Sequence, residues 1–164
     1  MSATIFKVSN INQGALFVMP KPSSDDLQQD INDFRQLGVS SVLSLLQTEE
    51  QIELGLSSQQ STCKQQGIEY LSFPIQDRGY PQLKELKQFL SPLIKQVENG
   101  TKIAVHCKGG IGRTGIVSCC LLIEHGYSAK EAIELVSNAR GRSVPDTDEQ
   151  KAFVFEYEKA YGRL

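Results

Sequence analysis

The chain has 164 residues, of which 40% are hydrophobic and 22% charged, with a formal net charge of −2. This balance is typical of a globular protein that buries a real core, so we expect one domain over residues 1–164 and no extensive disorder. No Lys/Arg-rich run and no apolar stretch of about 18 residues is present, which argues against a nucleic-acid partner and a membrane span. Residues 2–10 lack a signal-peptide core, and we expect a cytoplasmic protein, by default a monomer.

The first half of the chain alternates strand and helix patterns. In chain order these patterns predict strands over 4–8 and 15–18 with a turn at Gln13-Gly14, a helix from 23–26 to Gly38 with Leu27, Ile31, Phe34 and Leu37 on one face, a buried strand over 39–46, one or two helices within 47–66, and a strand over 68–73. The many glutamines of segment 47–66 are interpreted as solvated surface.

The second half continues the alternation, with helices dominating after the last strand. The patterns predict a helix over 83–97 that stops at Asn99-Gly100, a strand over 102–105, an apolar helix over 116–123 that stops at Gly126, a helix opened by the capping box Ser128-x-x-Glu131, and a last helix from Asp146-Thr147 with Phe153, Val154 and Tyr157 inward. Strands separated by helices predict an α/β fold with a central, mainly parallel sheet covered by helices on both faces.

Residues 105–115, Val-His-Cys-Lys-Gly-Gly-Ile-Gly-Arg-Thr-Gly, join the strand at 102–105 to the apolar helix. Three glycines within four positions allow backbone dihedrals closed to other residues, so successive N–H groups can point at one anion. The positive end of the following helix adds its field, and Arg113 supplies a planar fork for two oxygens. The segment matches neither of the usual nucleotide-binding fingerprints, Gly-x-x-x-x-Gly-Lys-Ser/Thr and Gly-x-Gly-x-x-Gly. The segment therefore predicts a cradle for a dianionic oxyanion.

Cys107 lies at the entrance of this glycine loop. The field that binds an oxyanion also stabilises a thiolate, which makes Cys107 the predicted nucleophile. A lone cysteine is more often a buried apolar thiol, and the surrounding Cys-x-x-Gly-x-x-Arg-Thr pattern is what favours the reactive interpretation. Ligands of such sheets bind beyond the carboxyl ends of the strands, where Cys107 is expected.

If Cys107 attacks an ester of such an oxyanion, a general acid is also needed to protonate the leaving alkoxide or phenoxide. The Pro- and Gly-rich loop 74–81 follows the predicted strand 68–73 and carries Asp77. Taken alone, Asp77 is better explained as a turn-forming residue. Because the neighbouring strand end carries the Cys107 loop, we expect Asp77 to be the acid.

The other three cysteines form no Cys-x-x-Cys pair, and only two histidines accompany them. We therefore expect neither a zinc site nor a disulfide framework. Cys119 and Cys120 fall within the apolar helix and are interpreted as core residues. A regulatory disulfide with Cys107 and a redox role for Cys63, Cys119 or Cys120 stay open.

The segment from His106 to Gly115 resembles the His-Cys-x5-Arg-Ser/Thr signature of cysteine-dependent protein tyrosine and dual-specificity phosphatases. The spacing Asp77-x-Gly-x-Pro81 is similar to the acid loop of the cyclin-dependent kinase-associated phosphatase group. Arg140-Gly141 and Thr147-x-x-Gln150 resemble a later segment of these enzymes, although Asp146 stands where many relatives have a glutamine. The likeness extends over most of the chain.

The resemblance implies a role for each matching residue and requires no metal or cofactor. Cys107 would carry the phosphoryl group, and Asp77 would first donate and then accept a proton. Thr114 would assist departure of the thiolate, His106 would order the loop, and Gln150 would position the hydrolytic water or serve only in a capping box. The residues expected to bind the substrate phosphate are Lys108, Gly109, Gly110, Ile111, Gly112 and Arg113.

The expected substrate is a phosphorylated protein. No aromatic-bearing insertion like that of large tyrosine-specific enzymes is apparent, which favours phosphoserine and phosphothreonine beside phosphotyrosine. Phosphatases acting on phosphoinositides or RNA 5′-phosphates share the loop and rank lower, because only Lys108 and Arg113 are charged within it. A catalytically inactive phosphopeptide-binding module is the remaining alternative.

Overall fold

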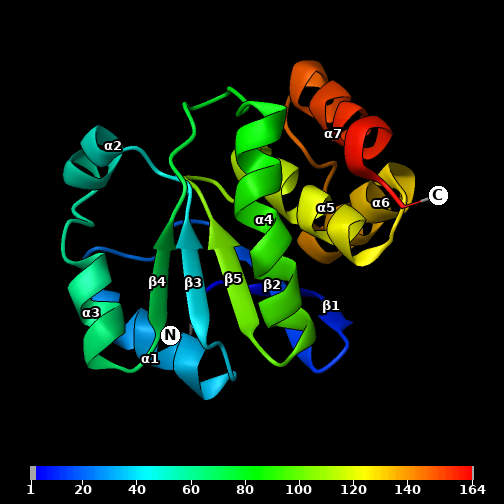
Figure 1. Ribbon diagram of the computed structural model, residues 1–164. Coiled ribbons are helices and arrows are strands. Elements are labelled where there is room, and N and C mark those ends of the chain that lie inside the picture. The colour runs from blue at the N-terminus through cyan, green and yellow to red at the C-terminus, as the bar shows by residue number, and fades with distance from the viewer. Residues whose placement is uncertain (1–2, 164) are drawn as a thin grey trace.

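The computed structural model describes residues 3–163 and has helices on both faces of a five-stranded sheet (Figure 1). Its elements in chain order are β1 (Phe6–Ile11), β2 (Gly14–Met19), α1 (Leu27–Gln36), β3 (Ser41–Ser44), α2 (Thr48–Glu53), α3 (Gln59–Gln65), β4 (Glu69–Ser72), α4 (Leu83–Glu98), β5 (Lys102–His106), α5 (Gly112–His125), α6 (Ala129–Arg140) and α7 (Asp148–Tyr161). No helix within residues 3–163 combines the length and apolar character that crossing a membrane requires.

The sheet has the strand order β1-β2-β5-β3-β4. Only β1 is antiparallel to its neighbour, so the predicted α/β fold with a mainly parallel sheet is confirmed. Met19 pairs with His106, His106 with Ser44, and Ser44 with Ser72. The last residues of four parallel strands therefore lie side by side, and the loops that follow them meet at one edge of the sheet.

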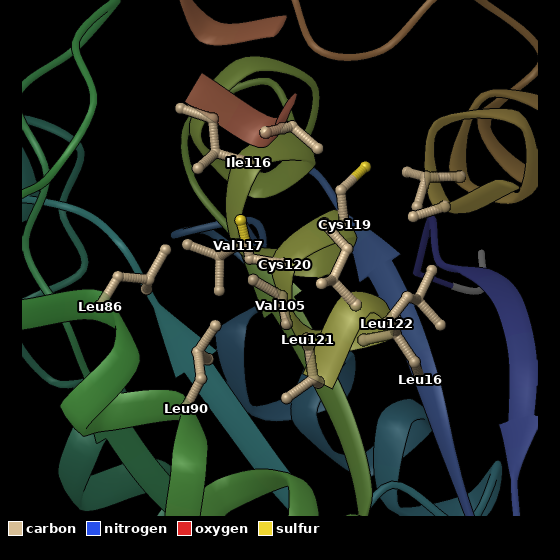
Figure 2. Packing of buried hydrophobic residues seen from close by; sticks show 14 of the residues in the cluster. Leu16, Leu86, Leu90, Val105, Ile116, Val117, Cys119, Cys120, Leu121 and Leu122 are labelled. Carbon is tan, nitrogen blue, oxygen red and sulfur yellow. The ribbon is translucent and has the colours of Figure 1, made fainter. Parts of the chain in front are cut away.

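Side chains alternate between the two faces of each strand and feed two separate cores. Leu16 and Val105 face the core covered by α4 to α7, whereas Phe17 and Ala104 face the core covered by α1 and α3. Figure 2 shows Leu16 and Val105 together with Leu86 and other apolar side chains of α4 and α5. Both faces are thus closed, as the expected two-sided covering requires.

Helix α5 runs through the centre of the first core and is buried at every position from Arg113 to Glu124. A helix that is apolar all round belongs in a protein interior, which explains why residues 116–123 are apolar except for Ser118. Gly115 permits a close approach, because a Cβ there would lie 2.3 Å from Val144 Cγ1. Val144 and Pro145 therefore pack directly against the first turn of α5, at the edge where the strands end.

Element boundaries differ from the sequence expectations at the first hairpin. β1 begins two residues later than expected, and the turn consists of Asn12 and Gln13 instead of Gln13-Gly14. Asn12 takes the left-handed conformation, which asparagine tolerates well. Gly14 already belongs to β2, where a Cβ would lie 2.0 Å from the Val97 carbonyl oxygen. The glycine serves close packing against α4 and not the turn.

Two further expectations were wrong in detail. The strand expected over 39–46 is only the four residues of β3, and its apolar continuation, Leu45 and Leu46, is buried beyond the strand end. Leu37, expected on the inner face of α1, is 55% exposed because the helix ends at Gln36 and the chain turns there. Apolar character alone therefore did not mark where these elements end.

Candidate active site

A cavity of about 450 Å³ opens at the edge where the parallel strands end. It is lined by Asp77, Arg78, Cys107, Lys108, Gly109, Ile111, Gly112, Arg113, Arg142, Asp146 and Gln150. The structure thus brings the Cys107 loop, the Asp77 loop and the start of α7 to one place, as expected from the sequence. Most of the residues proposed from the sequence share this cavity, and His106, Gly110 and Thr114 lie immediately around it.

Cys107 follows β5 directly and is only 3% exposed, at the bottom of the cavity. The hydroxyl of Thr114, in the first turn of α5, donates to Cys107 Sγ at 3.0 Å. The sulfur also lies at the N-terminal, positive end of α5. The structure therefore places a hydrogen-bond donor and a positive field at this sulfur.

The glycine loop presents its backbone amides to the cavity. The N–H groups of Gly109, Gly110 and Ile111 donate to no acceptor within residues 3–163. Gly110 has a φ of 74°, and a Cβ at this position would lie 2.5 Å from the backbone of Met19. Only glycine fits both the dihedral and the space, so the loop depends on it to keep its amides available for an oxyanion.

Arg113 is 2% exposed and held in one orientation by neighbouring oxygens. Its Nη1 and Nη2 lie 2.7 and 3.0 Å from the two carboxylate oxygens of Glu50, and Nη1 also donates to the Ile75 carbonyl at 2.9 Å. Asp77 Oδ1 lies 3.3 Å from Nη2. A bidentate pair of this kind fixes the guanidinium plane, so Arg113 can bind a phosphate without a change of side-chain conformation.

Glu50 was not identified from the sequence. It accepts the Gln47 amide at 3.0 Å in the capping box of α2, and it holds Arg113. Burial raises the pKa of Glu50, but hydrogen bonds from Arg113 and Gln47 and the positive charges of Arg113 and Lys108 outweigh it, so this pKa lies below its ordinary value. The available signal was a capping box, Gln47-x-x-Glu50, directly after a buried strand.

His106 is fully buried behind the loop. Its Nδ1 lies 3.0 Å from the Cys107 carbonyl oxygen and its Nε2 lies 2.9 Å from Gln59 Nε2. Burial, aided by the charges of Arg113 and Lys21, lowers the pKa of His106 to about 4 despite the hydrogen bond to Cys107. The neutral ring therefore donates from Nδ1 to the carbonyl and accepts from the Gln59 amide at Nε2, a tautomer assigned from the partners.

Gln59 corrects the interpretation of segment 47–66 as solvated. Its side chain is 1% exposed, and its Oε1 has no hydrogen-bond partner among the described residues. Burying the amide oxygen without a hydrogen bond costs free energy. The N–H group of the same amide bonds the buried ring of His106, which offsets this cost. Nothing in the local sequence separates this glutamine from its exposed neighbours, because its partner lies 47 positions away.

Asp77 lies across the cavity on the loop after β4, and its side chain is 59% exposed. Two contacts tie this loop to α7: Gln150 Nε2 donates to the Gly79 carbonyl at 3.0 Å, and the Tyr80 ring packs on Phe153 with centroids 5.5 Å apart. The loop is therefore held over the cavity from the α7 side.

Gln150 is 1% exposed and has contacts in several directions. Its Oε1 accepts the Thr147 amide at 3.1 Å, which completes the capping box of α7. A Cβ on Gly112 would lie 2.9 Å from this same oxygen, so the glycine leaves room for the amide against the glycine loop. Gln150 thus links the loop that carries Asp77, the glycine loop and α7.

Two arginines at the cavity were not anticipated. Arg78 follows Asp77, and Arg142 follows the end of α6 by two residues. Neither forms an ion pair with another described residue, and the same holds for Lys108. The cavity therefore has two positive side chains from outside the glycine loop, beside the carboxylates of Asp77 and Asp146.

The remaining three cysteines are fully buried away from the cavity, and all four cysteines are free thiols. Burial raises the pKa of Cys63 to about 11, and it also raises the pKa values of Cys119 and Cys120. Cys119 and Cys120 lie in the core around α5, as Figure 2 shows. Cys107 is the one cysteine at the cavity.

Residues 7–155 match the family model described as "Swiss Army Knife protein, DSP-PTPase phosphatase domain". Cyclin-dependent kinase inhibitor 3 of Rattus norvegicus is 25% identical over 134 residues, which are 80% of this chain and 63% of that protein. Tyrosine-protein phosphatase CDC14 of Saccharomyces cerevisiae is 38% identical over 68 residues, 41% of this chain and 12% of that protein. The chain thus spans less than two thirds of these relatives.

Solved structures show the same fold. Kinase associated phosphatase, with serine at its catalytic-site cysteine, superposes with a TM-score of 0.86 at 22% identity, covering 98% of this chain and 96% of that one. The active form of Tk-PTP has a TM-score of 0.73 at 26% identity, covering 94% and 97%. The chain therefore belongs to the DSP-PTPase phosphatase domain family.

Proposed function

We propose that this chain is a single-domain protein phosphatase that hydrolyses phosphotyrosine, phosphoserine and phosphothreonine through a cysteinyl-phosphate intermediate. The observation that carries the proposal is that one cavity is lined by Cys107, Arg113 and Asp77, which come from the segments that follow β5 and β4, two parallel strands with β3 between them. Nucleophile, phosphate ligand and proton donor are the three groups that the reaction needs.

In the first step the phosphate sits on the loop amides and the Arg113 guanidinium, and the thiolate of Cys107 attacks phosphorus opposite the ester oxygen. An S–P bond forms as the P–O bond breaks. The side chain of Asp77, above the cavity, gives its proton to the departing oxygen. Because Glu50 already orients Arg113, no reorganisation of the guanidinium is required during the transfer.

In the second step a water molecule attacks the cysteinyl phosphate and inorganic phosphate leaves. Asp77 accepts the proton of the water, and the electron pair of the S–P bond returns to sulfur. The Thr114 hydroxyl, 3.0 Å from Sγ, donates to the thiolate as it departs. Gln150 supports this step by holding the acid loop through Gly79, with the second N–H of its amide left for water.

The protein class of substrate is supported by the relatives, whose names include a cyclin-dependent kinase inhibitor and a tyrosine-protein phosphatase. No aromatic side chain is among the described residues that line the cavity, so nothing of that kind restricts entry to a phenyl ring. This lining supports phosphoserine and phosphothreonine as additional substrates. We also propose a monomer that works in the cytoplasm, where reducing conditions keep Cys107 a thiol.

A second candidate is a phosphatase for phosphoinositides or RNA 5′-phosphates. The sequence ranked these lower because few charges lie within the loop, but Arg78 and Arg142 bring unpaired positive charge to the same cavity from outside it. These arginines favour a substrate with several anionic groups. The relative rates of phosphate release from phosphopeptides, a phosphoinositide and a 5′-phosphorylated RNA decide between the two candidates.

The experiment measures phosphate release under EDTA from an aryl phosphate, matched phosphotyrosine and phosphothreonine peptides, a phosphoinositide and a 5′-phosphorylated RNA. We expect the wild-type chain to act on the aryl phosphate and the peptides, Cys107→Ser to be inactive, and Asp77→Ala to lose most activity on poor leaving groups. Faster turnover of lipid or RNA than of either peptide would refute the protein class. Phosphopeptide binding without turnover by the wild type would show an inactive binding module.

A further inference from the structure

Arg140, the last residue of α6, contacts the glycine loop from outside the cavity. Its Nη2 donates to the Gly109 carbonyl at 3.1 Å and its Nε donates to the Gly110 carbonyl at 3.2 Å. Arg140 is not among the described residues that line the cavity. Its guanidinium therefore meets the rear of the loop, opposite the side that would face a substrate.

The guanidinium is itself held in place by an aromatic ring. Arg140 Cζ lies 4.5 Å from the centroid of Phe6, in the edge strand β1. A cation above an aromatic face is attracted to it, and the flat guanidinium group keeps its plane when it stacks. Phe6 thus restricts the orientation in which Arg140 can offer its two donors.

The planarity of the peptide bond carries the consequence to the front of the loop. In a trans peptide the C=O of one residue and the N–H of the next point in opposite directions. Fixing the Gly109 carbonyl at the rear directs the Gly110 amide to the front, and fixing the Gly110 carbonyl directs the Ile111 amide the same way. The Lys108 carbonyl accepts the Lys21 amide at 3.1 Å, which orients the Gly109 amide likewise.

Two of these three anchors come from one side chain. The segment contains glycines, whose peptide planes rotate more easily than those of other residues. If either plane turned, a carbonyl oxygen would replace an N–H at the surface that must receive a dianion. The loop sequence permits the cradle, but it does not by itself choose the orientation that binds phosphate.

We propose that Arg140 is a positioning residue that holds the amides of Gly110 and Ile111 toward the substrate phosphate, with Phe6 as its support. The inference rests on the proposed phosphate-binding role of the loop. Arg140 acts through the two carbonyls and not by contact with substrate. Its removal should weaken the binding of an oxyanion and have a smaller effect on the free energy of unfolding.

The experiment measures the inhibition constant of tungstate, a tetrahedral dianion, together with kcat, KM and thermal unfolding. Four variants are compared: Arg140→Met removes the donors, Arg140→Lys keeps the charge without the planar fork, Phe6→Leu removes the ring, and Arg35→Met is the matched control. Arg35 is exposed on α1, and among the described residues its side chain bonds only Asn32, one turn away. An inhibition constant does not depend on the fraction of active protein, so partial misfolding cannot imitate the effect.

We expect Arg140→Met to bind tungstate on the order of tenfold more weakly, with a similar rise in KM for the aryl phosphate. Arg140→Lys should lie closer to Arg140→Met than to wild type, Phe6→Leu should show a smaller change in the same direction, and Arg35→Met should show none. Full rescue by lysine would mean that only charge matters and would overturn the inference, as would an unchanged inhibition constant in Arg140→Met. If the wild type itself neither binds tungstate nor releases phosphate, the proposed function fails instead.

Discussion

Replacing Glu50 by glutamine tests whether Glu50 fixes the orientation of Arg113 before a substrate binds. The substitution keeps one oxygen, which still accepts from one guanidinium nitrogen and from the Gln47 amide, but it places an NH₂ group against the other nitrogen. One charge-assisted hydrogen bond of the pair at 2.7 and 3.0 Å is therefore lost. Such a bond contributes about 1.5–3 kcal/mol, so we expect the free energy of unfolding to fall by roughly 2 kcal/mol.

Catalysis should suffer by a comparable free energy, because Asp77 remains the nearest carboxylate and draws Arg113 toward itself. A loss of about 2 kcal/mol corresponds to roughly a thirtyfold fall in kcat/KM. The assays are urea unfolding and aryl phosphate hydrolysis, with Glu49→Gln as the control, since Glu49 is exposed on the same helix and forms no ion pair with a described residue. Equal activity of Glu50→Gln and Glu49→Gln would refute the reasoning.

The acid dependence of Glu50 has a definite sign. Because its folded-state pKa lies below the ordinary 4.5, its contribution to stability is complete above that value and disappears as the pH falls through the lowered folded-state pKa. The stability difference between wild type and Glu50→Gln should therefore shrink in strong acid. A difference that stays constant with pH would show that the carboxylate charge is not what holds Arg113.

Three further predictions concern stability. The pKa of His106 is about 4 in the folded state and ordinarily 6.5, so the unfolded state takes up a proton first as the pH falls. The free energy of unfolding should therefore decline by about 3 kcal/mol between pH 6.5 and 4. Urea titrations should find this decline much reduced in His106→Asn. Gly110→Ala forces a Cβ to within 2.5 Å of the Met19 backbone at a positive φ, and we expect a lower melting temperature and loss of phosphatase activity; a variant as active as wild type would contradict the loop geometry. Tyr157→Phe removes a 2.7 Å hydrogen bond to buried Glu124, which should reduce the free energy of unfolding by about 1–3 kcal/mol while kcat/KM stays near wild type; equal urea midpoints would contradict this.

The glycine loop could be found from sequence because its chemistry is local. Cys107, Arg113 and Thr114 lie within eight consecutive residues, and the dihedral freedom of glycine is readable from composition. Asp77 needed one further inference, that parallel strands of one sheet end at the same edge, and the sheet register bears this out. The expectation that the two strands are neighbours was wrong, because β3 lies between β4 and β5. The mainly parallel fold itself followed from alternating strands and helices.

The residues that escaped prediction act through partners distant in the chain. Glu50 is 63 positions from Arg113, and Gln59 is 47 positions from His106. Each lies in a short polar helix whose sequence is typical of a surface, and only the folded chain shows which polar side chain turns inward. Leu37 illustrates the converse, since its spacing fits the inner face while the end of α1 leaves it exposed.

The separation of the four thiols into three core residues and one in the cavity offers a practical tool. Alkylating reagents such as iodoacetamide react with thiolates that they can reach, and burial with a raised pKa withholds Cys63, Cys119 and Cys120 from them. In the native protein one equivalent of label should therefore suffice to abolish turnover. Its stoichiometry, read by mass spectrometry, would count competent enzyme molecules in any preparation, and unfolding should release three more reactive sites.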